Sequence, residues 1–332
     1  MPGSYRQINY SLRPAKTVER KMMCEAFRRL YPFGKIETYR YVGFGSIYFS
    51  DFQLFHRVLG MDDMLSIEKD ADAEKCFEFN KPYKCVRIDC RPASEVLPGL
   101  DWQIKTITWL DCESKLDEMV LSDVVSVCAK VCSGSVLIVS VNVNAEYDPD
   151  DATRQNYACE TGLTFNIDDY RLREMKKRLG IHLTPEVRGH ELRGTGLASI
   201  SRRVIHSSIE EALSARNGVL PLGKKLINHQ IFNFHYRDGA RMLTIGWIFF
   251  EADDQFKFDA CSFNELKFVR FEEEPYTINV PCLTIKEIRH LNAQLPRVAI
   301  DEVDIPGVPP SDIKHYAELY RYFPTFAEAI FT

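Results

Sequence analysis

The chain has 332 residues, of which 45% are hydrophobic and 27% charged, a composition typical of a soluble globular protein and unlike that of disordered or membrane-embedded chains. The N-terminus has no apolar core of signal-peptide length, and no run approaches the length of a membrane span, so we expect a cytoplasmic protein without a membrane partner. The ten cysteines are scattered and form no Cys-x-x-Cys pair, which predicts free thiols and no metal site.

The net charge of -5 conceals two basic regions. Residues 1–40 hold nine Lys/Arg against three acids, and residues 170–225 hold twelve against five. A basic surface can bind RNA or a phosphorylated small molecule. Alternatively, these side chains only cover solvated helix faces. Residues 170–225 are therefore a candidate surface for a small-molecule or RNA substrate.

Residues 1–35 are predicted to form an N-terminal helical segment, with a helix over 17–31 and Thr17 as its N-cap. From residue 36 onward, short apolar runs alternate with helical patterns. Strands are predicted at 41–42, 63–68, 84–90, 105–110 and 135–143, with helices at 51–59, 70–79, 92–97 and 113–132 between them. Asp51 is the expected cap of the first of these helices. This alternation predicts an α/β fold with a doubly wound, mostly parallel sheet.

The stretch from residue 39 to 68 gives the strongest functional signal. An apolar run meets a turn with Gly43, Gly45 and Ser46, a helical pattern follows, and a second apolar run closes on Glu68. In a βαβ unit, such glycines let a ligand approach, and an acid about 20 residues further on takes ribose hydroxyls. A dinucleotide fingerprint would have a third glycine where Tyr48 stands, and that side chain would crowd a pyrophosphate. The pattern favours S-adenosylmethionine over NAD or FAD, and a tight turn without a ligand is the alternative.

Residues 146–225 form an expected insertion. It contains an acidic connection, a basic helix over 168–180, a glycine-punctuated stretch near 188–196 and a helix over about 197–215. Its role is either substrate recognition or that of a packed helical appendage. The next two apolar runs, 228–237 and 241–251, flank Asp238-Gly239, which is the strongest short-range signal for a β-hairpin.

Residues 253–332 are predicted to form an α+β C-terminal extension. Strand-like runs cover 255–263 and 266–271, and a helix over 284–295 opens with a capping box of Thr284 and Glu287. A last helix is expected to begin at Ser311. Its aromatic side chains provide either an oligomer contact or core packing.

A βα series that finishes in an antiparallel hairpin resembles the class I, Rossmann-like S-adenosylmethionine-dependent methyltransferases, and among them bacterial proteins described as O-methyltransferases. The resemblance covers residues 36–145 and 226–252, which we expect to form the cofactor-binding domain. It implies that the insertion shapes the substrate pocket. It also implies cofactor contacts from the glycine turn to the methionine part, from the acid after the second strand to the ribose, and from the next strand ends to the adenine; these residues are Gly43, Phe44, Gly45, Ser46, Glu68, Asp89, Cys90 and Asp111.

Methyl transfer from a sulfonium is an in-line displacement, which needs geometry and a deprotonated nucleophile more than a metal. The resemblance places Asp111 where the family keeps catalytic residues. The Asn/Asp-Pro-Pro-aromatic motif of amino-directed nucleic-acid methyltransferases is absent there, since this chain reads Asp111-Cys112-Glu113-Ser114. An oxygen acceptor remains by elimination, with Asp111 or Glu113 as the base.

Three other functions stay open at this point. The chain could be a catalytically silent effector or partner protein in a bacterial multi-protein system, one that binds S-adenosylmethionine or a nucleotide. An RNA-directed methyltransferase is a second alternative. An NAD-linked oxidoreductase is a third, disfavoured by Tyr48 and by the terminal hairpin.

Overall fold

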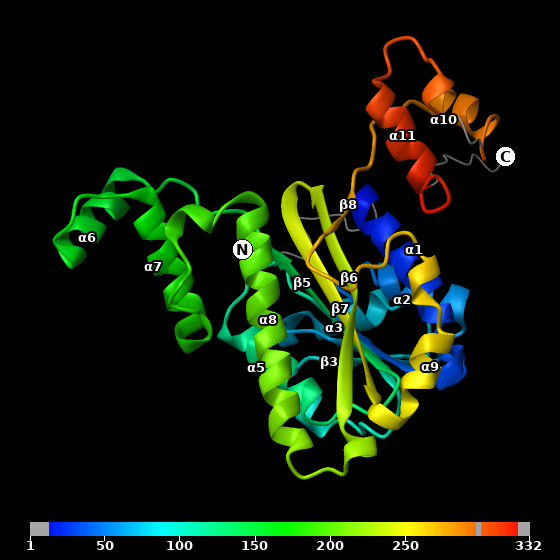
Figure 1. The fold of residues 1–332 in the computed structure, drawn as a ribbon, viewed down its shortest axis with the longest axis horizontal. Helices are drawn as coiled ribbons and strands as arrows, with labels where there is room; N and C mark the ends of the chain where they lie inside the picture. Colours follow the sequence, from blue (N-terminus) through cyan, green and yellow to red (C-terminus); the bar gives the residue numbers. More distant parts are fainter. Residues whose placement is uncertain (1–12, 297–299, 325–332) are drawn as a thin grey trace.

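A computed structural model describes residues 13–296 and 300–324; the outer parts of the predicted N-terminal segment and C-terminal extension lie outside these ranges. The described chain is built around an eight-stranded sheet with the order β3-β2-β1-β4-β5-β7-β6-β8 (Figure 1). The strands are β1 (Arg40–Gly43), β2 (Asp63–Ile67), β3 (Val86–Asp89), β4 (Thr106–Asp111), β5 (Ser135–Asn142), β6 (Leu226–Asp238), β7 (Ala240–Glu251) and β8 (Tyr276–Ile278).

Strands β1 to β5 pair in parallel, and β7 runs antiparallel to both β5 and β6. The predicted fold class is confirmed. The chain winds from β1 outward to β3 and then returns to place β4 on the other side of β1. This reversal separates the carboxyl ends of β1 and β4, which is where ligands of open α/β sheets bind.

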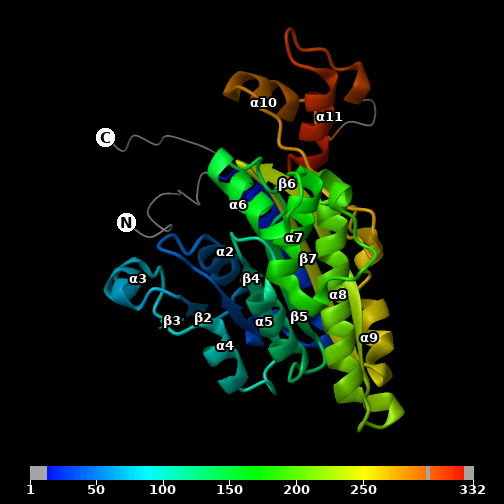
Figure 2. The same cartoon turned by 90° about the vertical axis from the view of Figure 1, so that its left-hand side faces the viewer.

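Helices cover both faces of the sheet (Figures 1 and 2). On one face lie α1 (Pro14–Arg28), α2 (Ser50–Leu59), α3 (Glu74–Asn80) and α9 (Gln255–Ala260), and on the other lie α4 (Ala93–Val96), α5 (Glu118–Cys128) and α8 (Gly194–Asn217). Each face has its own apolar core. The residues of β5 are buried except the last, because both faces of this central strand are covered.

Two parts extend from this body. The helices α6 (Asp151–Thr161) and α7 (Ile167–Leu179) form an arm to one side, and α10 (Ile285–Asn292) with α11 (Pro310–Leu319) forms a C-terminal lobe with its own small core (Figure 1). The predicted capping box at the start of α10 is present. None of the helices in the described part of the chain combines the length and apolar character that crossing a bilayer requires.

Two predicted helix starts are wrong. Helix α1 begins at Pro14, three residues before Thr17, because Asp238 of the hairpin accepts hydrogen bonds from the first backbone N–H groups of the helix. Helix α2 has Phe49 at its N-cap position in the left-handed region, and Asp51 instead accepts a hydrogen bond from the buried hydroxyl of Tyr41.

Three predictions about the later chain also need correction. The acidic connection after β5 contains helix α6, whose N-cap Asp150 accepts a hydrogen bond from the backbone of Thr153. The strand-like run at 255–263 forms helix α9, since Lys257 pairs with Asp254 at helical spacing. The run at 266–271 is irregular, and the strand that the pattern missed is β8. The ten cysteines are free, as predicted.

Candidate functional site

The turn after β1 and the end of β2 meet at the carboxyl edge of the sheet. The backbone N–H of Gly45 donates to Ser66 Oγ at 2.9 Å, and that of Ser46 donates to Glu68 Oε1 at 3.0 Å. Ser66 Oγ in turn donates to the same carboxylate oxygen at 2.7 Å. The structure therefore brings the glycine turn and the buried Glu68 into direct contact.

Close packing explains the glycines of this turn. A Cβ atom on Gly43 would lie 2.5 Å from the hydroxyl of Tyr41, and one on Gly45 would lie 2.4 Å from the ring of Phe49. The turn also holds two residues other than glycine in the left-handed region, Ser46 at φ 54° and Phe49 at φ 45°. Such backbone strain costs about 1 kcal/mol or more per residue and concentrates at ligand sites.

Phe44, the remaining predicted residue of the turn, lies between these glycines. Its partly buried side chain packs against the core on the α5 and α8 face of the sheet. The turn is thereby anchored on that face, while Phe49 anchors it on the face that α1 covers.

Burial raises the pKa of Glu68 to about 7, and the hydrogen bonds from Ser66 and Ser46 only partly oppose this effect. Its hydrogen bonds within the described residues end on Oε1. The second oxygen, Oε2, is thus available to accept hydrogen bonds from a ligand. A carboxyl group that titrates near neutral pH at a sheet edge is a candidate functional group.

The end of β3 places two further predicted residues at the same edge. Asp89 accepts hydrogen bonds from Arg91 Nε at 2.9 Å and Nη2 at 2.6 Å, and these bonds hold the pKa of its carboxyl below the usual value. Cys90 is half-buried against the core on the α1 face. Asp89 is therefore already held by an arginine next to it in sequence.

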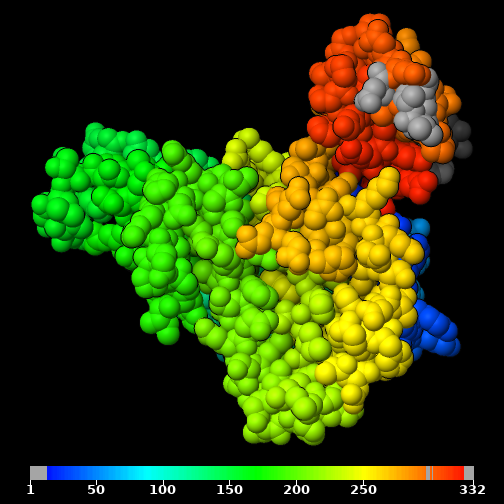
Figure 3. Space-filling model, viewed as in Figure 1, coloured from blue at the N-terminus to red at the C-terminus, as the bar shows by residue number. Residues whose placement is uncertain are grey.

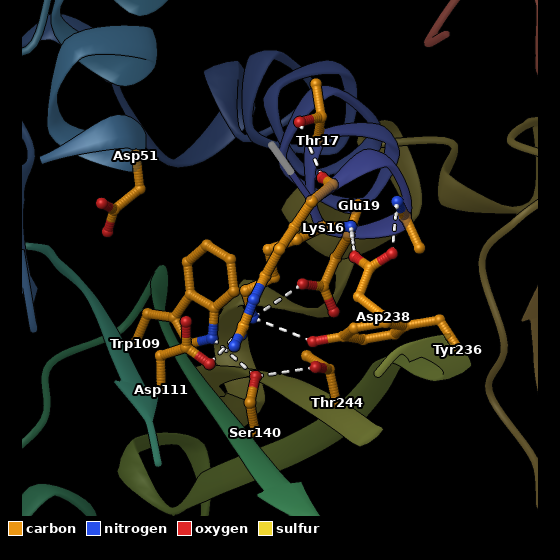
Figure 4. Close-up of polar contacts among 12 residues, drawn as sticks. Lys16, Thr17, Glu19, Asp51, Trp109, Asp111, Ser140, Tyr236, Asp238 and Thr244 are labelled. Carbon is orange, nitrogen blue, oxygen red and sulfur yellow. Dashed lines mark hydrogen bonds and ion pairs between the residues drawn. The ribbon is translucent and has the colours of Figure 1, made fainter. Parts of the chain in front are cut away.

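The end of β4 carries a buried ion-pair network (Figure 4). Lys16 comes from the first turn of α1 and is 2% exposed. Its Nζ donates to Asp111 Oδ1 at 2.8 Å and to the hydroxyl of Tyr236 at 3.1 Å. The same atom lies 2.9 Å from Glu19 Oε2 and 4.3 Å from the centre of the Trp109 ring. Lys16 thus ties α1 to β4 and β6.

Electrostatics keep Lys16 charged. Burial alone would lower the pKa of its ammonium, but the carboxylates of Asp111 and Glu19 outweigh burial and raise it above the ordinary value. Burial raises the pKa of Glu19, although Lys16 opposes that shift. Asp111 is therefore a carboxylate held in one orientation by a buried cation. Glu113, the other predicted base, lies 3.6 Å from the guanidinium of Arg13.

Sequence reasoning selected Asp111 but did not predict its contact with Lys16. The available signal was weak: Lys16, Glu19 and Met23 fall on one face of the helix at spacings of three and four, so two charged residues share a face with core residues. Buried charges are nearly always paired, which would have predicted a partner for Lys16 but not which one.

Half of the twelve Lys/Arg of residues 170–225 form ion pairs with acids. Five of these ion pairs are Arg171–Asp168, Arg173–Glu160, Lys177–Glu174, Arg178–Glu146 and Arg202–Glu273. Much of the positive charge counted in residues 170–225 is therefore neutralised nearby. A protein surface that binds RNA needs cationic side chains that are free to bind its phosphates.

One group in the described chain has the residue types of a metal site. Donor atoms of His56, Asp62 and Cys85 all lie within 4.8 Å of one another, before the amino ends of β2 and β3. The ring nitrogen Nδ1 of His56 is 3.0 Å from the carbonyl oxygen of Met61. These contacts join the end of α2 to the following turn, at the opposite edge of the sheet from Glu68.

The strand order, the antiparallel seventh strand, and the acid that meets the glycine turn at the carboxyl edge define a class I, Rossmann-like S-adenosylmethionine-dependent methyltransferase. The family described as "Putative O-methyltransferase" matches residues 8–331, and the chain belongs to this family. The predicted methyltransferase class is thus confirmed. No curated protein matches the sequence.

Solved structures show similarity at low identity. Trm1 from Pyrococcus horikoshii, in complex with S-adenosyl-L-methionine, matches at 10% identity and a TM-score of 0.47, covering 96% of this chain and 85% of that protein. A putative O-methyltransferase from Klebsiella pneumoniae matches at 15% identity and a TM-score of 0.35, covering 69% of this chain and 80% of that protein. A mutant of MtNAS in complex with S-adenosylmethionine matches at 15% identity and a TM-score of 0.26, and the match covers 35% of this chain and 46% of that protein.

Proposed function

We propose that this methyltransferase transfers the methyl group of S-adenosylmethionine to an oxygen atom of a small acceptor. The family to which the chain belongs supports the oxygen acceptor. The observation that carries the cofactor assignment is the contact between the glycine turn and Glu68, which leaves Oε2 of a buried carboxylate available at the carboxyl edge.

In this proposal, the turn from Gly43 to Ser46 lies against the methionine part of the cofactor. Glu68 Oε2 accepts hydrogen bonds from the ribose hydroxyls, and the end of β3, with Asp89 and Cys90, lies near the adenine. When bound, the cofactor supplies a methyl group on a positively charged sulfur. The carboxylates of Glu68 and Asp111 give this edge the negative charge that suits a sulfonium.

Asp111 has the role of orienting the acceptor hydroxyl and taking its proton as the methyl group moves from sulfur to oxygen. Its Oδ1 is held by Lys16, so the carboxylate keeps one orientation while Oδ2 meets the acceptor. Lys16 acts through Asp111 and is a positioning residue. Glu113, at the same strand end, is the alternative proton acceptor.

A small molecule is favoured over RNA because half of the Lys/Arg of residues 170–225, including four on α7, are paired with acids of the same chain. This pairing leaves little free positive charge on the arm formed by α6 and α7. The chemistry at Asp111 requires only one hydroxyl or carboxylate oxygen from the acceptor.

The cofactor assignment is tested by thermal unfolding with S-adenosylhomocysteine. We expect the ligand to raise the melting temperature, because it binds the folded state only. Glu68→Gln should weaken binding by about tenfold or more, since hydrogen bonds to an ionised group contribute roughly 1.5–3 kcal/mol. Glu95→Gln, at an exposed position on α4, is the matched control and should keep the full shift. An unchanged shift in Glu68→Gln would contradict the assignment.

The acceptor atom is tested by incubating the protein and a cell extract with S-adenosylmethionine labelled with ¹³C in the methyl group. The chemical shift of the labelled carbon in the product distinguishes an O-methyl from an N-methyl group. A product carrying only N-methyl label contradicts oxygen transfer. If S-adenosylhomocysteine binds but no labelled product forms, the silent-effector alternative is favoured instead.

A further inference from the structure

A cavity of about 600 Å³ opens beside the end of the β6–β7 hairpin. Its wall comes from the start of α8, from the hairpin, from the segment after β8 and from α11. A second cavity of about 220 Å³ shares Thr195, Ala198 and His235 with it and continues between α8 and β6. Figure 3 shows the hairpin end and the C-terminal lobe as separate projections from the body. The two cavities share part of their lining, and we refer to them together as the α8 groove.

The mouth of the α8 groove has an excess of positive charge. Arg237 and Arg241, at the hairpin end, line the wider cavity, and neither side chain has an ion-pair partner among the described residues. Asp312 is the one acid of this wall, and His315 faces it from the same helix, where its ring contacts Asn279 at 3.5 Å. Two guanidinium groups against one carboxylate favour an anionic ligand.

Helix α8 adds to this preference, because it begins at the groove. Its first residues, Gly194, Thr195 and Gly196, line the cavities, and the N-cap residue makes no side-chain capping hydrogen bond. The first turn contains no acid. The first N–H groups of a helix lack partners within the helix, and its N-terminus carries a partial positive charge.

The inner end of the α8 groove contains an unpaired acceptor. Asn233 is 1% exposed, and its Nδ2 donates to the backbone oxygen of Glu273 at 2.8 Å. Its Oδ1 is buried with no hydrogen-bond partner. A buried polar atom without a partner costs roughly 1–3 kcal/mol, so a ligand that brings a donor to Oδ1 would be bound more tightly. His235 lies beside it, and burial lowers its pKa to about 4, so that the ring is neutral.

We propose that the α8 groove is a second small-molecule site, beside the methyl-transfer site, for a ligand with a carboxylate or phosphate at one end and a hydroxyl or amine donor at the other. The anionic end lies between Arg237, Arg241 and the start of α8, and the donor reaches Asn233 Oδ1. Tyr236 lines the groove and hydrogen-bonds Lys16, which connects the groove to Asp111. This site is separate from the contacts of the proposed function, since neither Glu68 nor Asp111 lines either cavity.

The experiment measures binding of 4-hydroxybenzoate to the full chain by ligand-observed NMR, at a fixed excess of S-adenosylhomocysteine. Two comparison probes test the contribution of each end of the ligand: 4-hydroxybenzamide lacks the negative charge, and benzoate lacks the hydrogen-bond donor. We expect saturable binding of 4-hydroxybenzoate and weaker binding of both comparison probes. Arg241→Gln should weaken the binding of 4-hydroxybenzoate by about tenfold, since a charge-assisted hydrogen bond is lost. Arg203→Gln is the matched control, on the exposed face of α8.

Three results would overturn this site in the α8 groove: equal binding to Arg241→Gln and wild type, equal binding of the amide and the carboxylate, or no saturable binding of 4-hydroxybenzoate. The melting-temperature shift caused by S-adenosylhomocysteine is recorded in the same samples. If that shift is present but 4-hydroxybenzoate does not bind, the proposed site in the α8 groove is wrong and the cofactor assignment stands. If the shift is absent from wild type, the proposed function itself fails.

Discussion

At the scale of single residues, Glu68 makes the stability of the folded protein depend on pH. Its pKa is raised to about 7 in the folded protein by burial, against an ordinary value of 4.5. Between these two values the folded state keeps a proton that the unfolded state has lost. The contribution of Glu68 to stability is therefore fully present below about pH 4.5 and is lost as the pH rises through about 7.

The same residue makes cofactor binding depend on pH. Ribose hydroxyls donate to the ionised carboxylate, so binding must remove the proton that burial favours. We expect the affinity for S-adenosylhomocysteine, measured by calorimetry, to rise by about tenfold from pH 6 to pH 8. Glu68→Gln should abolish the pH dependence that is due to this group. An affinity of the wild type that stays constant over this range would show that Glu68 does not titrate on binding.

How far sequence predicts this site depends on how local each contact is. The turn at Gly43 to Ser46 and the acid at Glu68 form one βαβ unit, so their proximity follows from a repeating local geometry. Lys16 reaches Asp111 across 95 positions and Tyr236 across 220. No spacing rule predicts which strand end a helix from the N-terminus will contact. The network around Lys16 therefore emerges only from the tertiary structure.

At the scale of elements, the start of α1 is set by the hairpin. Asp238 Oδ1 accepts from the backbone N–H of Ala15 at 3.2 Å, and Oδ2 accepts from that of Lys16 at 2.9 Å. A side chain 222 positions away thus acts as the N-cap of α1. This is why a local rule placed the cap at Thr17, and it also explains how the Lys16 side chain is directed toward β4.

Removal of this cap should loosen the start of α1. We expect Asp238→Ala to lower the free energy of unfolding in urea by about 1 kcal/mol, the usual cost of losing an N-cap. Hydrogen exchange should speed up at the amides of Ala15 and Lys16. Asp72→Ala, at an exposed position, serves as the control and should leave both measurements unchanged. Unaltered protection at Ala15 and Lys16 in Asp238→Ala would show that the hairpin does not hold the helix.

The element that sequence reasoning misread most, residues 255–271, shows a second limit. Phe256 and Phe258 alternate with polar residues, which is a strand pattern over so short a run. Phe258 nevertheless stacks on Phe250 of β7 and on His229 of β6, because the chain turns back over the hairpin as a short helix. In a segment of six residues, tertiary packing outweighs periodicity.

At the scale of the whole molecule, three apolar cores differ in size and in their relation to the sheet. Two large cores lie on the two faces of the sheet, and a small one lies inside the C-terminal lobe around Leu291, Ile313 and Tyr316. The lobe is tied to the body by Leu319 of α11, which packs in the core on the α1 face, and by polar contacts to α1, among them Lys21 Nζ to the backbone oxygen of Phe323 at 2.8 Å. A lobe whose own core is small should open without unfolding the sheet.

Two cavity-forming variants test this independence. Ile313→Ala lies in the lobe core and Val124→Ala lies in α5 on the sheet; truncation of a buried Ile to Ala costs about 2–5 kcal/mol. We expect Ile313→Ala to reduce hydrogen-exchange protection in α10 and α11 while α5 and β5 keep theirs. Val124→Ala should lower protection throughout the sheet, because those residues exchange by global unfolding. If Ile313→Ala reduces protection in β5 as strongly as in α11, the lobe and the sheet unfold as one cooperative unit.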